Sequence, residues 1–116
     1  MPQLPLNKFK QIVAKSVQSL SNEIKEQLKD IQIVIEVYPS DEQLIGTGLE
    51  NKLNLLSLYE GIPLSEKYGY ENILPDKITL FQESLESISI IEDQLIKEIQ
   101  NSISSEISHQ MKLSEN

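Results

Sequence analysis

The sequence predicts a single α+β domain in which a small mixed sheet, three-stranded or larger, packs against helices. First, a chain of 116 residues with 39% apolar and 24% charged residues suits one domain with a modest core. Second, helical periodicity at both ends flanks short β-branched and apolar runs, in the order helix, helix, strand, loop, strand, loop, strand, helix. Third, no internal repeat or linker interrupts the chain, so we expect residues 1–116 to form one unit.

Two predicted helices open the chain. Between residues 7 and 20, apolar side chains recur at three- and four-residue spacing, which indicates an amphipathic helix. These side chains are Phe9, Ile12, Val13, Val17 and Leu20. Asn7 is expected to cap this helix, because asparagine is a preferred residue at that position. Ser21 opens a second, shorter helix that is expected to end near Asp30.

Three strands are predicted in the middle of the chain. Residues 31–38 are rich in β-branched side chains, alternate in polarity and stop at Pro39, so they indicate a strand with one buried face. Residues 55–59 form a shorter candidate. Residues 78–81 form another, which the chain enters from a turn at residues 75–77.

Two intervals between these elements are predicted as loops. Residues 41–54 have turn composition and no sustained period. Their Gly46-Thr47-Gly48 segment lacks the third glycine and the strand-to-helix turn of a phosphate-binding loop, so we interpret it as a plain flexible loop. Residues 64–74 are also expected to be irregular.

The last and longest predicted helix runs from about Ile91 to Met111. Glu92 and Asp93 in its first turn suit the helix dipole. A four-residue ladder of apolar side chains marks one inward face. The ladder consists of Leu95, Ile99, Ile103 and Ile107, joined by Ile96. We expect this helix to pack on a sheet that contains the strands at residues 31–38 and 78–82.

Composition narrows the classes of function. Acidic residues outnumber basic ones by 18 to 10, the net charge is −8, and the basic residues are scattered lysines. Because phosphate binding requires clustered positive charge, we expect no nucleic-acid partner. No apolar run approaches the roughly 18 residues of a membrane span, and the N-terminus lacks a secretory signal, so we expect a cytoplasmic protein without membrane contact. The absence of cysteine excludes disulfides and thiolate chemistry. The oligomeric state stays open.

The last helix carries the residues that point to chemistry. Glu106 falls inside the apolar face, where a carboxylate must be paired or placed at a cavity. Ser105 and His109 stand four residues apart, which is the spacing of two metal ligands on one helix, and Glu115 follows six residues later. A His-Glu-x-x-His helix with a third ligand at that distance binds zinc, and its glutamate polarises metal-bound water for attack on a carbonyl.

Ser105 stands where that motif has its first histidine. A neutral serine hydroxyl is a poor zinc ligand. A metal held by His109 and Glu115 alone would be weakly bound and would do little to lower the pKa of its water. We therefore expect zinc, if it binds, to be weakly bound or absent.

Three further segments carry a resemblance to a known family. They read LLSLYEGIPLSEK from Leu55 to Lys67, PDKITLF from Pro75 to Phe81, and Glu-Ser-Leu at residues 83–85. These segments resemble the minimal zincin-like metallopeptidase family, in which an LYEG-hydrophobic-PL stretch, a PD-x-I-x-LF strand and a closing HExxHxxGxxD helix occur in this order. The resemblance covers nearly the whole chain, and its middle segment is the most specific part.

The resemblance implies a minimal zincin-like fold with an active-site-type helix at its C-terminal end. It assigns Glu106 as general base, His109 and Glu115 as metal ligands, and Ser105 as the occupant of the first ligand position. The family's glycine, which lets the chain turn so that the third ligand swings back, is Lys112 here. Either Lys112 adopts a strained positive φ, or the helix continues and Glu115 points away.

Three functions remain open from the sequence. The first is a metallopeptidase-like protein with a degenerate zinc motif and weak or absent hydrolase activity, which acts as a non-catalytic domain that binds a peptide or protein. The second is an active zinc-dependent peptidase whose ligand set is completed by another side chain such as Glu60, or by water. The third is a scaffold in which Glu106 and His109 bond each other. Tyr59 is expected to pack rather than react.

Overall fold

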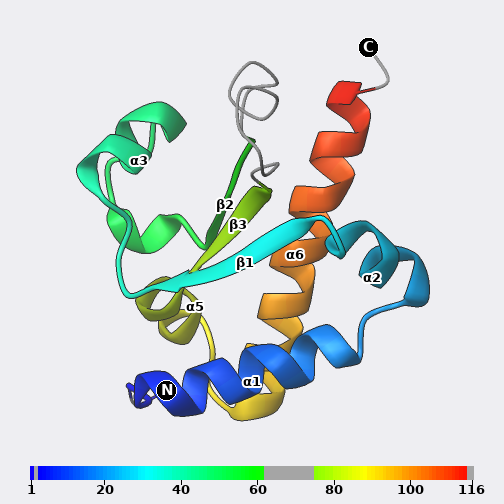
Figure 1. Ribbon diagram of the computed structural model, residues 1–116. Coiled ribbons are helices and arrows are strands. Elements are labelled where there is room, and N and C mark those ends of the chain that lie inside the picture. Colours follow the sequence, from blue (N-terminus) through cyan, green and yellow to red (C-terminus); the bar gives the residue numbers. More distant parts are fainter. Residues whose placement is uncertain (2, 62–74, 115–116) are drawn as a thin grey trace.

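Short β-branched runs and longer amphipathic runs become the strands and helices of an α+β fold, as expected (Figure 1). The computed structural model describes residues 1, 3–61 and 75–114. Along these ranges the elements are α1 (Leu6–Gln18), α2 (Asn22–Leu28), β1 (Ile31–Glu36), α3 (Asp41–Thr47), a 3-10 turn (Lys52–Asn54), β2 (Ser57–Glu60), β3 (Asp76–Phe81), α5 (Gln82–Ser87) and α6 (Glu92–Ser114). The expected irregular segment at 64–74 lies outside the described residues, as does Glu115.

The described strands form one mixed sheet in the order β1-β3-β2. β1 runs parallel to β3, and β2 runs antiparallel to it. The register places Ile33 beside Ile78, and Ile78 beside Tyr59. Because side chains alternate along a strand, these three residues and their neighbours two positions away share one face. β1 and β2 are the two edges of this sheet.

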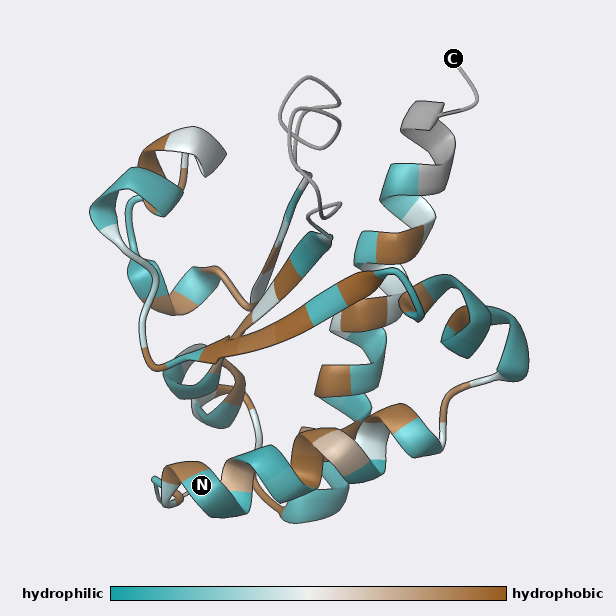
Figure 2. Cartoon of the chain, viewed as in Figure 1, coloured by the Kyte–Doolittle hydropathy of each residue, from teal (hydrophilic) through white to brown (hydrophobic). Residues whose placement is uncertain are grey.

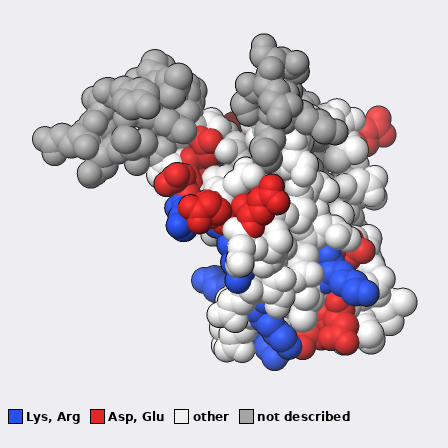
Figure 3. All heavy atoms as spheres, turned by 90° about the vertical axis from the view of Figure 1, so that its right-hand side faces the viewer, with Lys and Arg blue, Asp and Glu red and all other residues white. Residues whose placement is uncertain are grey.

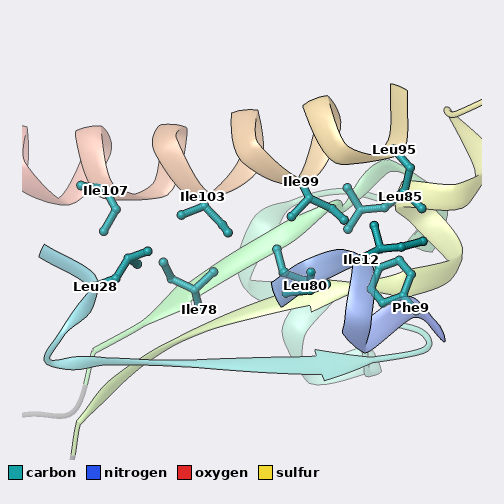
Figure 4. Packing of buried hydrophobic residues seen from close by; sticks show 11 residues of the cluster. Phe9, Ile12, Leu28, Ile78, Leu80, Leu85, Leu95, Ile99, Ile103 and Ile107 are labelled. Carbon is teal, nitrogen blue, oxygen red and sulfur yellow. The ribbon is translucent and has the colours of Figure 1, made fainter. Parts of the chain in front are cut away.

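Helices α1, α2 and α6 cover that face (Figure 1). In Figure 4, Ile103 of α6 points toward Ile78 of β3. One turn earlier, Ile99 lies above Leu80. In Figure 2, hydrophobic and hydrophilic residues alternate around α1 and α6. Each helix therefore buries only its hydrophobic side. Each fully buried isoleucine or leucine contributes roughly 1.5–3 kcal/mol, so this layer supplies most of the fold's stability. The buried cluster is Phe9, Ile12, Val13, Leu28, Ile78, Leu80, Leu85, Leu95, Ile99, Ile103 and Ile107.

The predicted N-terminal cap is confirmed for α2 and is wrong for α1. Ser21 caps α2, because its Oγ accepts a hydrogen bond from the Ile24 N–H at 3.3 Å. The expectation that Asn7 caps the first helix is wrong. The Pro5 carbonyl already accepts hydrogen bonds from the N–H groups of Lys8 and Phe9, so α1 begins one residue before Asn7.

The prediction of a loop at residues 41–54 is wrong for the first half of this interval, which forms α3. Ser40 and Gln43 make a reciprocal capping box. The Ser40 Oγ accepts from the Gln43 N–H at 3.1 Å, and the Gln43 Oε1 accepts from the Ser40 N–H at 2.8 Å. Gly48, at φ 75°, ends the helix in the left-handed region that favours glycine. The capping box of Ser40 and Gln43 therefore stabilises a helix here although the segment contains two glycines.

The C-terminal helix α6 is continuous from Glu92 to Ser114, three residues beyond the predicted end. Glu92 and Asp93 lie in its first turn, as expected. The six residues of α5 were not predicted, since so short a helix gives no measurable period. No helix in the described ranges combines the length and apolar content needed to cross a membrane.

Candidate functional site

Glu106 and His109 lie on the same continuous helix, α6, as the sequence predicted. The Glu106 side chain is half-buried beside the isoleucine ladder. Its Oε1 accepts a hydrogen bond from the Ser57 Oγ at 3.0 Å. Ser57 belongs to β2 and shares the α6-facing side of the sheet with Tyr59. The carboxylate on the apolar face is thus partnered by a hydroxyl from another element.

A cleft of about 530 Å³ lies between β2 and α6, and both residues of the motif line it. We call it the β2–α6 cleft. Its lining residues are Thr47, Leu55, Ser57, Leu58, Tyr59, Ser105, Glu106, His109 and Gln110. Glu106 is the one acidic residue among these described residues, which otherwise supply apolar surface, hydroxyls, an imidazole and an amide. Sequence reasoning missed Ser57 and Thr47, although the alternation of β2 placed Ser57 on the same face as Tyr59.

Ser105 and His109 keep the spacing of two metal ligands. Both side chains are exposed and line the β2–α6 cleft together. They also line a neighbouring hollow of about 390 Å³ along the outer side of α6. Ser105 therefore stands beside His109 where the first ligand is expected, and it presents a hydroxyl there instead of an imidazole.

Tyr59 packs against the core and also lines the cleft. Its phenol Oη donates a hydrogen bond to the Asp76 Oδ2 at 2.6 Å. Burial raises the pKa of Tyr59 above its ordinary value, and the hydrogen bond and charge of Asp76 raise it further. The phenol is therefore neutral at physiological pH, which agrees with a packing role and excludes a phenolate base.

Glu60 does not complete a ligand set with His109. It follows Tyr59 directly in β2, so its side chain points to the opposite face of the sheet. There its Oε1 lies 3.9 Å from the Lys77 Nζ and accepts a hydrogen bond from the Gln43 Nε2 at 3.4 Å. The hypothesis that Glu60 supplies the missing ligand is therefore not supported by its position.

The described residues do not fit a zinc ion. Within residues 1, 3–61 and 75–114, no group of three or more histidine, cysteine, aspartate or glutamate residues is close enough to hold a metal. The helix continues through Lys112, and Gly48 is the only residue with positive φ in the described part of the chain. Of the two alternatives for Lys112, the continuing helix is the one observed. Nothing at that residue turns the chain back toward His109.

The described part of the chain thus combines a small mixed sheet with a long helix that carries Glu-x-x-His beside an edge strand. The sequence profile of the family described as zincin-like metallopeptidase matches residues 28–116. The chain belongs to this family, and the match runs from the end of α2 through α6. No curated protein matches the chain.

Proposed function

We propose that this chain is a zincin-like domain that has lost its zinc site and binds an extended peptide or protein segment in the β2–α6 cleft. The observation that carries the proposal is Ser105, which takes the place of a histidine beside His109 on a helix that continues through Lys112. Zinc hydrolases use three protein ligands and an open fourth position. Their bound water loses a proton near neutral pH only when the metal is firmly held.

Without that water, Glu106 has nothing to deprotonate. Its Oε1 instead accepts the hydrogen bond from Ser57, so the carboxylate serves as a fixed polar group in the wall of the cleft. We infer that hydrolase activity is weak or absent. The domain then acts through binding, for which the cleft and its neighbouring strand remain available.

The edge of β2 supports peptide binding. The Leu56 carbonyl accepts a hydrogen bond from the Phe81 N–H at 3.0 Å, so Leu58 and Glu60 also exchange bonds with β3. In an antiparallel pair the residues between them point their main-chain groups outward. No described strand pairs with the outer edge of β2, so Ser57 and Tyr59 offer N–H and C=O groups along this edge, where an extended segment can add as a further strand.

A peptide-library cleavage assay with added zinc tests the loss of catalysis. We expect the unaltered protein and Glu106→Gln to release products at the same background rate, because no metal-bound water depends on the carboxylate. Metal-dependent cleavage that disappears in Glu106→Gln would show a working hydrolase and overturn the proposal. The same library, analysed for retained uncleaved peptides, reports binding.

A further inference from the structure

Among the described residues, no lysine forms an ion pair with Glu106. The ion pairs in the described part of the chain join Glu92, Glu26 and Glu60 to lysines, and none includes Glu106. Ser57 occupies one oxygen, Oε1. The second oxygen, Oε2, has no hydrogen-bond partner among the described residues, and the Glu106 side chain lines the cleft.

The rest of the cleft suits the stem of a long basic side chain. Leu55 and Tyr59 supply apolar surface among the residues that line it. Lysine and arginine lay their methylene groups along such surfaces while the charged head reaches a polar partner. A hydrogen bond between a cation and a carboxylate is shorter and stronger than a neutral one, so an ammonium or guanidinium is the group that Glu106 binds best.

The position of Glu106 relative to the outer edge of β2 determines which side chain of a bound segment can reach its carboxylate. Ser57 bonds Glu106 through its side chain and points its main-chain groups outward. A segment added along β2 alternates its side chains, so every second one faces α6. The side chain that lies opposite Ser57 on this face comes next to Glu106.

We propose that the β2–α6 cleft recognises an extended segment with a lysine or arginine at this place, held by the Glu106 carboxylate. This inference rests on the proposed function and names the chemistry of its ligand. The surplus of acidic over basic residues, 18 to 10, favours approach of a cationic segment. On the face drawn in Figure 3, acidic side chains gather near mid-height, with a lysine beside them, and further acidic side chains and lysines lie close together near the bottom.

Fluorescence anisotropy with labelled extended peptides tests the proposal. The peptides are identical except for one central residue, which is lysine, arginine, norleucine or glutamate; norleucine keeps the stem and removes the charge. We expect the lysine and arginine peptides to bind roughly tenfold more tightly than the norleucine peptide at low salt, and the preference to shrink as salt is raised. The glutamate peptide should bind most weakly.

Two matched variants locate the effect. Glu106→Gln keeps the shape and the hydrogen bond to Ser57, and it should remove the preference for lysine while the norleucine peptide binds as before. Glu60→Gln removes a carboxylate from the same strand but from the opposite face, and it should leave the preference unchanged. Equal, salt-independent binding of the lysine and norleucine peptides overturns this inference and leaves peptide binding intact. A preference that persists in Glu106→Gln, or is lost in Glu60→Gln, also overturns it. Failure of every peptide to bind overturns the proposed function as well.

Discussion

At the scale of single residues, the site is organised by one hydrogen bond between distant parts of the chain. Ser57 and Glu106 are 49 positions apart, and their side chains meet at 3.0 Å where β2 lies against α6. A half-buried carboxylate beside Ile103 and Ile107 is costly unless it is solvated or bonded. The hydroxyl supplies one bond and the cleft supplies access to water, which explains how a glutamate is tolerated beside the ladder.

Substitutions at this pair test that explanation through stability. Ser57→Ala should lower the free energy of unfolding by about 1 kcal/mol, because the carboxylate loses its partner. Glu106→Gln should leave stability unchanged or raise it, since a neutral amide costs less to bury and still accepts from Ser57. Urea unfolding of both variants and of the double variant measures the coupling. A loss in Glu106→Gln as large as that in Ser57→Ala would mean that the charge itself stabilises the fold.

At the scale of elements, α3 builds one wall of the cleft. The helix has seven residues, and its capping box and terminal Gly48 define both of its ends. Thr47 near its C-terminal end lines the β2–α6 cleft. So short a helix has little stability of its own, so the capping interactions weigh heavily in its formation.

Ser40→Ala tests whether α3 shapes the cleft. Loss of the cap should destabilise the protein by about 1 kcal/mol and weaken peptide binding, because Thr47 is no longer held in place. Ser21→Ala is the matched control, since Ser21 caps α2, which does not line the cleft. It should cost similar stability and leave peptide affinity unchanged. Thermal unfolding and the anisotropy titration give the two readouts, and equal affinities of both variants would remove α3 from the binding surface.

The elements also mark where sequence reasoning succeeds and where it stops. The strands and α6 were predictable because β-branched runs and the isoleucine ladder are strong, repeated signals. α3 was missed because Gly46 and Gly48 suggested a loop, although the capping box was present in the sequence. Glu106 and His109 follow from spacing on one helix, whereas their neighbours Ser57 and Thr47 depend on packing between elements that no local pattern encodes. Glu60 was a candidate that the two-residue alternation of β2 already argued against.

At the scale of the whole molecule, the stability of the fold does not depend on a histidine at the first ligand position of the metal motif. The sheet, the covering helices and the match over residues 28–116 place the chain in the zincin-like metallopeptidase family. These features depend on the buried cluster, to which Ser105 does not belong. The residue at this exposed position can therefore change without cost to the core, so an intact fold does not require a zinc ligand there.

The number of zinc ions bound per chain tests most directly the proposal that this chain keeps a zincin-like fold without a zinc site. Metal analysis after equilibration with zinc should find well below one ion per chain in the unaltered protein and more in Ser105→His, which restores the i, i+4 pair with His109. Ser108→His is the control, because it adds an imidazole next to His109 at a spacing that cannot share a metal, and it should not raise zinc content. One tightly bound zinc per chain in the unaltered protein would contradict the account.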